Sequence, residues 1–118
     1  MAKYRRDELS TVLLAIGDPT RRAILEKVSR GEPSVLEIAE SFSISLPAVS
    51  KHLKVLEKAG LILRKKEGRI HRFKLIARPM KDASEWISHY ERFWQAQLGS
   101  LGAYLEEAGK EEKNHGKK

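Results

Sequence analysis

The sequence predicts a mainly α-helical domain with one small β-hairpin, and three observations support this fold class. Apolar residues recur at helical spacing in several segments before residue 60 and again in a long segment after residue 78. Between Leu61 and Leu75 the pattern changes to the two-residue alternation of strands. The chain has 118 residues and no cysteine, so it holds about one domain and can form neither disulfides nor thiolate metal sites.

The first two helices are predicted on either side of the break at Gly17-Asp18-Pro19. Asp18 can cap the second helix, and Pro19 suits its first position. That helix continues to about Arg30, before the break at Gly31-Glu32-Pro33. The apolar residues expected on the inner faces are Leu9, Val12, Leu13 and Ile16 in the first helix, and Ile24, Leu25 and Val28 in the second.

A third, short helix should begin at the capping-box pattern Ser34-Val35-Leu36-Glu37 and bury Leu36, Ile38 and Ala39. After a short linker, Ser45 can cap a fourth helix, which continues to Ala59 and stops at Gly60. Two helices of these lengths joined by a turn of three or four residues predict a helix-turn-helix.

Residues 61–75 predict a two-stranded hairpin with a basic tip, whose turn centres on Glu67-Gly68. Because an isolated hairpin is marginally stable in water, we expect a Leu63/Phe73 face to pack on the preceding helices. A long last helix is predicted from about Met80 to Glu107. The chain therefore divides into one domain, residues 1–107, and a charged tail, residues 108–118, that is predicted to be disordered.

The positive charge of the chain is concentrated in one block. Residues 45–78 contain ten lysines and arginines and two acids, a net charge of +8, whereas the whole chain carries +7 and the other 84 residues sum to −1. Such a block indicates a face that binds a polyanion, although a solvated basic surface that binds nothing is the alternative.

The fourth helix has the residue distribution of a helix that binds in the DNA major groove. Val49, Leu53 and Leu56 share its core face, and lysines lie opposite them. His52 lies between these faces, and it either supports the helix as a half-buried histidine or contacts DNA. The residues predicted to contact DNA from this helix are Leu46, Pro47, Ala48, Ser50, Lys51, His52 and Lys54. Those predicted from the hairpin are Arg64, Lys65, Lys66, Arg69, His71 and Arg72.

Three segments together resemble the ArsR/SmtB family of bacterial winged helix-turn-helix repressors: Asp18-Pro19-Thr20-Arg21-Arg22, the run from Ser45 to Leu56, and Ala59-Gly60-Leu61-Ile62. The resemblance covers about residues 8 to 105. It implies a homodimer that binds an inverted-repeat operator and blocks transcription until a signal releases it.

The recognition helix departs from the family at two positions. The family often begins this helix with Gln-Pro-Thr, whereas this chain has Leu46 and Ala48 beside the matching Pro47. Leucine cannot make the bidentate contact with adenine that glutamine makes. We therefore expect base reading from Ser50, His52 and Lys51, with apolar contacts from the two replaced positions.

Metal-sensing members of the family carry a Cys-x-Cys pair in the third helix, or Asp and His ligands in the last helix. Here the third helix reads Ser34-Val35-Leu36, and the last helix offers Asp82, Glu85 and His89. One histidine beside scattered acids falls short of a usual zinc site. The sequence thus predicts no metal and no cofactor, although adventitious metal binding at His89 stays open and the inducer is unknown.

The last helix carries a broad apolar and aromatic stripe, which indicates an interface as well as a core. We expect this helix and the first helix to pair with their symmetry mates in a dimer. The predicted interface residues are Leu9, Val12, Leu13, Ile16, Trp86, Tyr90, Phe93, Trp94, Leu98, Leu101 and Leu105. A pocket for a small organic ligand at the same place is the alternative reading of the aromatic residues.

The predicted function is therefore sequence-specific binding of double-stranded DNA by a homodimeric transcriptional repressor in the cytoplasm. The alternatives are a nonspecific architectural DNA-binding protein and a regulator that senses an organic ligand at the dimer interface. Enzymatic activity is not expected, because the chain has no Gly-rich phosphate loop and no recognisable set of nucleophile, base and acid. No membrane partner is expected either, since the apolar runs are too short to span a bilayer.

Overall fold

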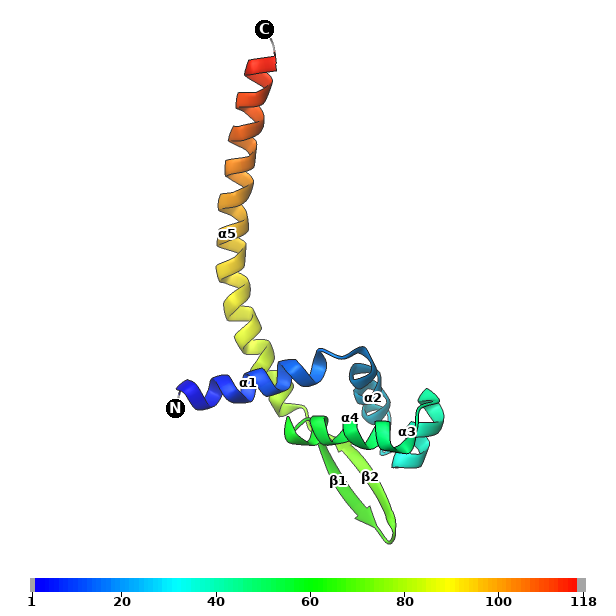
Figure 1. Cartoon of the computed structure of the whole chain (residues 1–118). Helices are drawn as coiled ribbons and strands as arrows, with labels where there is room; N and C mark the ends of the chain where they lie inside the picture. The colour runs from blue at the N-terminus through cyan, green and yellow to red at the C-terminus, as the bar shows by residue number, and fades with distance from the viewer. Residues whose placement is uncertain (1, 117–118) are drawn as a thin grey trace. The chain divides into compact units, whose positions relative to one another are not determined.

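A computed structural model describes the backbone of residues 2–116 and the side chains of residues 8–110. The elements are α1 (Ala2–Ile16), α2 (Pro19–Ser29), α3 (Val35–Phe42), α4 (Leu46–Lys58), β1 (Ile62–Glu67), β2 (Ile70–Leu75) and α5 (Arg78–Gly116) (Figure 1). The predicted fold class is confirmed, because the described residues form five helices and one antiparallel hairpin in the winged helix-turn-helix order. The chain forms two compact units, residues 1–83 and residues 84–118.

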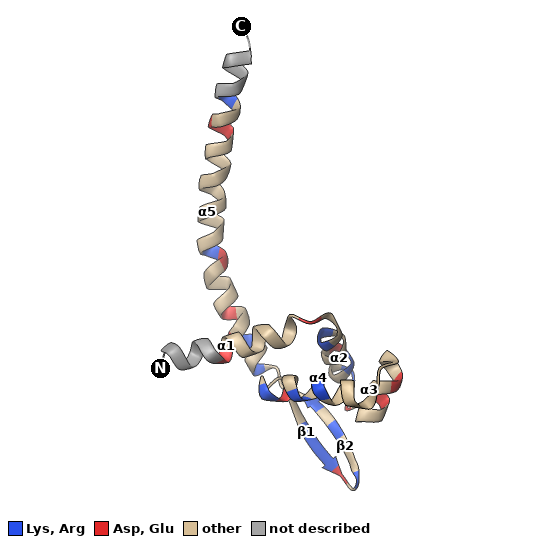
Figure 2. Cartoon of the chain, viewed as in Figure 1, with Lys and Arg blue, Asp and Glu red and all other residues tan. Residues whose placement is uncertain are grey.

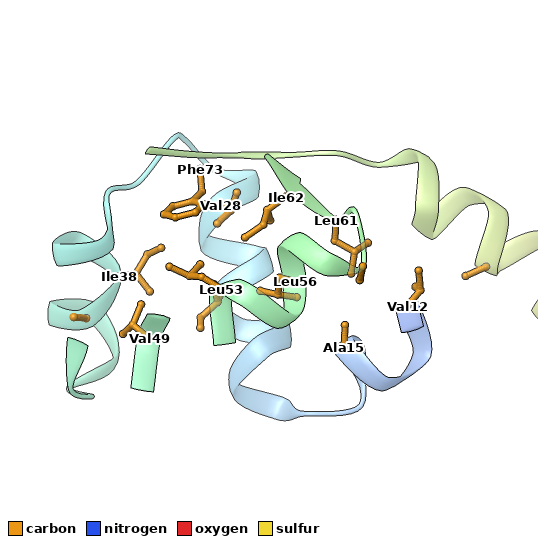
Figure 3. Packing of buried hydrophobic residues seen from close by; sticks show 14 residues of the cluster. Val12, Ala15, Val28, Ile38, Val49, Leu53, Leu56, Leu61, Ile62 and Phe73 are labelled. Carbon is orange, nitrogen blue, oxygen red and sulfur yellow. The ribbon is translucent and has the colours of Figure 1, made fainter. Parts of the chain in front are cut away.

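The core of the first unit surrounds one side of α4. Val49, Leu53 and Leu56 are fully buried, as their helical spacing predicted. They pack in one cluster with side chains of α2, α3 and the hairpin, among them Ile38 and Phe73 (Figure 3). Because α4 contacts α1, α2, α3 and β1, its orientation is held from several directions.

The helix ends follow the chemistry read from the sequence. The hydroxyl oxygens of Ser34 and Ser45 accept hydrogen bonds from the backbone N–H groups of Glu37 and Ala48, at 3.2 and 3.3 Å. Gly60 follows the α4 C-cap with a φ of +74°. Its N–H donates to the Glu57 carbonyl and that of Leu61 to the Leu56 carbonyl, at 2.9 and 3.1 Å, which is the Schellman arrangement.

The turn between α3 and α4 contains a residue in the left-handed region. Ser43 has a φ of 51°, and it is the one residue other than glycine with a positive φ in the described part of the chain. Behind it, the N–H of Ile44 donates to the carbonyl of Ala39 at 3.3 Å, which closes the end of α3. This reversal directs the chain into Ser45, the cap of α4.

The hairpin differs from its prediction in the face that it buries. Leu63 is 54% exposed, whereas Ile62 and Phe73 are 3% and 0% exposed. Arg64, and not Leu63, pairs with Phe73, so Ile62 shares the inner face with Phe73 and Leu63 lies on the opposite face of β1. The turn residues are also shifted: Glu67 pairs with Ile70, and Gly68 takes the positive φ at the first turn position, as in a type II′ turn.

Three further expectations are corrected. Leu36 is 61% exposed and does not join the core with Ile38 and Ala39. The first helix begins at Ala2, although its helical spacing of apolar residues starts only at Leu9. The last helix runs from Arg78 past the expected end at Glu107 to Gly116; the added stretch contains glutamates and lysines, which favour helix, although it also contains glycines, which do not. Part of the predicted tail, residues 117–118 and the side chains from residue 111 onward, lies outside the described residues, and the division into domain and tail stays a prediction.

Candidate nucleic-acid interface

The side of α4 that faces away from the core is polar and basic. Pro47, Lys51 and Lys54 are exposed, and Leu46 is 46% exposed at the start of the helix. Ala48 and Ser50 are half-buried beside the core face. Within the described residues neither of the two lysines forms an ion pair, so both ammonium groups are free to meet an anion. Figure 2 shows lysines and arginines, in blue, along α4 and both strands of the hairpin.

The basic residues of the hairpin fall into two groups. Arg64 pairs with Glu57 at 2.8 Å, and Lys65 pairs with Glu32 at 3.1 Å. Lys66 and Arg69, at the tip, are exposed and have no ion-pair partner in the part of the chain that the structure describes. The tip pair is therefore the more available of the two groups for phosphate.

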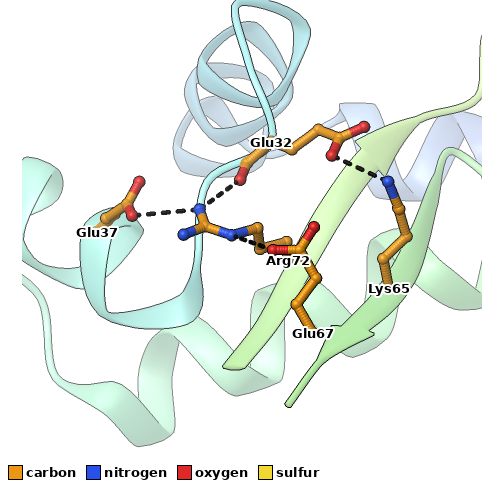
Figure 4. A network of polar contacts seen from close by, with 5 residues as sticks. All are labelled: Glu32, Glu37, Lys65, Glu67 and Arg72. Carbon is orange, nitrogen blue, oxygen red and sulfur yellow. Dashed lines mark hydrogen bonds and ion pairs between the residues drawn. The ribbon is translucent and has the colours of Figure 1, made fainter. Parts of the chain in front are cut away.

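Arg72 connects the hairpin to the helix-turn-helix through a network that the sequence did not reveal (Figure 4). Its Nη1 donates to the carbonyl oxygen of Glu32 at 3.0 Å and to Glu37 Oε1 at 3.4 Å. Its Nε donates to Glu67 Oε2 at 3.1 Å. Its side chain is 29% exposed. These contacts make Arg72 an anchor of the hairpin, which differs from the DNA contact expected for it.

Two other hairpin residues are partly enclosed by, or in contact with, the protein itself. The guanidinium of Arg64 lies over the ring of Phe73, 5.1 Å from its centroid, in a cation–π contact. His71 is half-buried, and its Nδ1 is enclosed without a hydrogen-bond partner among the described residues. The hairpin residues predicted to contact DNA thus include some that are exposed to solvent and others that hold the hairpin in place.

The segment Asp18-Pro19-Thr20-Arg21-Arg22 forms the junction between α1 and α2. Asp18 Oδ2 accepts a hydrogen bond from the N–H of Arg21 at 2.9 Å, and this bond holds the pKa of the carboxyl below its usual range. Both arginines donate to carbonyls at the end of α1: Arg21 to Ala15 and Leu14, and Arg22 to Ile16. The segment therefore joins α1 to α2, a role that its composition alone did not indicate.

His52 lies at the edge of the α4 core face, as its helical position predicted. It is half-buried, and its Nδ1 lies 3.5 Å from Nη1 of Arg21. The interaction joins α4 to the α1–α2 junction, and it leaves part of the imidazole accessible.

The residues expected at the dimer interface differ in exposure. Val12 is 4% exposed and belongs to the protomer's own core, which corrects its assignment to the interface, and Leu9 and Ile16 pack against that core. Leu13 is 41% exposed, and Leu14, which the periodicity did not single out, is 72% exposed.

On α5, by contrast, nearly every predicted interface residue is exposed. Tyr90, Phe93, Trp94, Leu98, Leu101 and Leu105 are between 48% and 60% exposed, and Trp86 is half-buried. His89 makes edge-on contacts with the rings of Trp86 and Tyr90. Such a long apolar stripe is unusual on a surface that contacts only water.

Among the described residues, no group of three His, Cys, Asp or Glu side chains lies close enough together to hold a metal ion. The same residues contain no helix that is both long and apolar enough to cross a membrane.

The fold and its basic face define a class of protein: a helix-turn-helix with an adjoining basic hairpin, in which the second helix is apolar toward the core and cationic toward solvent. Comparison with known proteins indicates the same class. A helix-turn-helix domain family matches residues 16–64. The chain is 34% identical to the transcriptional repressor SdpR of Bacillus subtilis over 82 residues, which span 70% of this chain and 91% of that protein.

Solved structures give the same result. A crystal structure of an ArsR family transcriptional regulator superposes with a TM-score of 0.70 at 33% identity, over 76% of this chain and 93% of that one. The solution structure of a homodimeric winged helix-turn-helix DNA-binding domain from Mycobacterium bovis, a possible ArsR-family regulator, has a TM-score of 0.60 at 23% identity, over 80% and 81% of the two chains; it shows the shared fold alone.

The protein therefore belongs to the ArsR family of winged helix-turn-helix transcriptional regulators. Its relatives regulate transcription and are not enzymes, which points away from enzymatic activity.

Proposed function

We propose that two copies of this chain bind an inverted-repeat operator and repress transcription from it. In each copy α4 enters the major groove, and the hairpin tip contacts the neighbouring backbone. One observation carries the proposal: three apolar residues of α4 are fully buried, while Lys51 and Lys54, on the opposite side, are exposed without ion-pair partners among the described residues. A helix held in this way can present its side chains to base edges and phosphates.

The apolar stripe of α5 supports pairing of two copies. Its residues include Phe93, Trp94 and Leu98, each more than half exposed in the single chain. Burying such a stripe against a second copy removes a large apolar area from water, which is the main driving force for association. The structural neighbour from Mycobacterium bovis is homodimeric. In a dimer that binds successive major grooves, the two α4 helices would lie about 34–36 Å apart.

The proposal includes three finer points. Release from DNA does not use the usual metal sites of the family, because the third helix offers Ser34-Val35-Leu36 in place of a Cys-x-Cys pair. No enzymatic step takes part. As a regulator that binds operator DNA, the protein works in the cytoplasm.

Binding to promoter DNA over a salt series tests the function. Fluorescence anisotropy with a fragment of the protein's own promoter, an inverted repeat found within it, and random DNA of equal length would give the three affinities. We expect the inverted repeat to bind at least 1,000-fold more tightly than random DNA, as specific regulators do. Equal affinities with one salt slope would instead identify a nonspecific architectural protein, and sedimentation showing a monomer at micromolar concentration would refute the dimer.

Two kinds of variant separate base reading from phosphate binding. Ser50→Ala should change the preference among operator variants, whereas Arg69→Ala should weaken binding to all sequences and lower the salt slope by about one. Lys110→Ala removes the same charge from a distant part of the sequence and serves as the control, which should change neither quantity. If Ser50→Ala and Arg69→Ala behaved alike, the division into readers and phosphate contacts would be wrong.

A further inference from the structure

The side chain of Arg21 connects the end of α1 to α4. Its Nε donates to the carbonyl of Ala15 at 2.7 Å and its Nη2 to the carbonyl of Leu14 at 2.9 Å, where α1 has carbonyls without helical partners. Its remaining nitrogen, Nη1, lies 3.5 Å from Nδ1 of His52. Because a guanidinium is planar and rigid, the two bonds to α1 also determine where Nη1 meets the imidazole.

The contact with Arg21 selects one form of the His52 ring. A guanidinium has five N–H donors, no acceptor and a permanent charge. Nδ1 of His52 can therefore meet Nη1 favourably only as an acceptor. A neutral imidazole with an unprotonated Nδ1 carries its proton on Nε2. The other neutral tautomer would place two N–H groups against each other.

We infer that Arg21 is a positioning residue for DNA recognition, which holds His52 so that its Nε2–H donates to an acceptor on the DNA. This inference rests on the proposed function, in which α4 lies in the major groove. The acceptors of suitable chemistry are O6 and N7 of guanine at a base edge and the oxygens of a phosphate. His52 is half-buried, so its ring can keep the contact with Arg21 while its accessible part meets the DNA.

The neighbouring arginine provides a matched control. Arg22 donates through Nη1 to the carbonyl of Ile16 at 2.7 Å, at the same end of α1. Among the side chains that the structure describes, Arg22 forms no hydrogen bond or ion pair with α4. Arg22→Met and Arg21→Met each remove a guanidinium from the end of α1, but Arg21→Met alone removes the contact with His52.

The first test reads the imidazole in the protein without DNA. Long-range ¹H–¹⁵N correlation spectra distinguish the two neutral tautomers of a histidine. We expect the Nε2–H tautomer of His52 in the unaltered protein and in Arg22→Met, and a mixture of tautomers in Arg21→Met. A dominant Nδ1–H tautomer in the unaltered protein, or no change on removing Arg21, would overturn the inference.

The second test measures affinity for the operator and for random DNA in a double-mutant cycle of Arg21→Met and His52→Ala. Arg21→Met should weaken operator binding about fivefold more than Arg22→Met, as expected for the loss of one hydrogen bond. In the His52→Ala background this difference should vanish. A loss confined to the operator would identify a base edge as the acceptor, and an equal loss on random DNA would identify a phosphate.

The outcomes separate this inference from the proposed function. If the unaltered protein binds the inverted repeat no better than random DNA, the proposed function fails, and the recognition role of Arg21 fails with it. If the protein discriminates well but Arg21→Met equals Arg22→Met in affinity, the inference alone fails. Urea unfolding of both single variants shows that each remains folded during the binding measurements, and Arg21→Met, which loses more hydrogen bonds than Arg22→Met, should lose more stability.

Discussion

Replacing Arg72 with methionine tests whether this residue anchors the hairpin or contacts DNA. In the folded protein its guanidinium bonds to the carbonyl of Glu32 and to the carboxylates of Glu37 and Glu67. Methionine keeps an apolar stem of similar length and loses every donor. The variant therefore removes the network and leaves most of the packing in place.

The size of the effect follows from the exposure of each contact. A charge-assisted hydrogen bond to a part-buried carbonyl contributes about 1.5 kcal/mol. Glu37 and Glu67 are 52% and 56% exposed, so each ion pair is screened by water and adds only about 0.3 kcal/mol. We expect a loss of about 2 kcal/mol in the free energy that holds the hairpin. Amide exchange in β1 and β2 should then accelerate about thirtyfold.

Urea unfolding and amide hydrogen exchange measure these quantities, and Arg30→Met is the control. The side chain of Arg30 is 76% exposed and has a single pair with Glu26 one helical turn away, so its loss should cost less than about 0.5 kcal/mol. If Arg72→Met changed neither the unfolding free energy nor exchange in the hairpin, the anchoring role would be refuted. A lower salt slope for DNA in that case would make Arg72 a phosphate contact.

Three further predictions concern the turn, the junction and the dimer. Ser43→Gly should stabilise the protein by about 0.5–1 kcal/mol in urea unfolding, because glycine adopts the φ of 51° without a Cβ clash, and Ser43→Ala should give no such gain. The pKa of Asp18 is lowered mainly by the N–H of Arg21 and further by the charge of that residue, so its carboxylate stabilises the fold above the unfolded-state pKa, and this contribution is lost as pH falls through the lower folded-state value. Asp18→Asn should therefore make the melting temperature less dependent on pH below about pH 4, and an unchanged slope would contradict this. Leu98→Glu should shift sedimentation toward the monomer, whereas Gln95→Glu, which adds the same charge to α5, should not; a dimer in both variants would place the interface elsewhere.

Much of the DNA-facing helix could be predicted because its causes are local. The spacing of Val49, Leu53 and Leu56 depends only on the helical repeat, and the three are fully buried. The caps at Ser34 and Ser45 reach three residues along the chain, and both hydrogen bonds form as predicted. Contacts between residues within one helical turn can therefore be predicted from the sequence.

The capping box of α3 shows where local rules end. Ser34 accepts the expected hydrogen bond from the backbone N–H of Glu37, but the carboxylate of Glu37 accepts from Arg72. A local pattern names the residues able to form a contact. The competing partner comes from a strand that lies 35 residues further along the chain.

The strand register and the long-range ion pairs could not be predicted from the sequence pattern. Leu63 and Phe73 fit an alternating face equally well, yet the register pairs Phe73 with Arg64, so Leu63 lies on the exposed face and Phe73 is buried. In the same way, nothing in the composition of the hairpin separates the paired cations Arg64, Lys65 and Arg72 from the unpaired tip.

Helices, caps and the basic block were readable because each depends on residues within one or two turns of each other. The identity of the free cations, the anchor at Arg72 and the contact between Arg21 and His52 depend on packing that brings together segments 31 to 40 residues apart. The sequence gives the sign and the position of each charged residue. The fold determines whether a carboxylate of the same molecule already pairs with a given lysine or arginine.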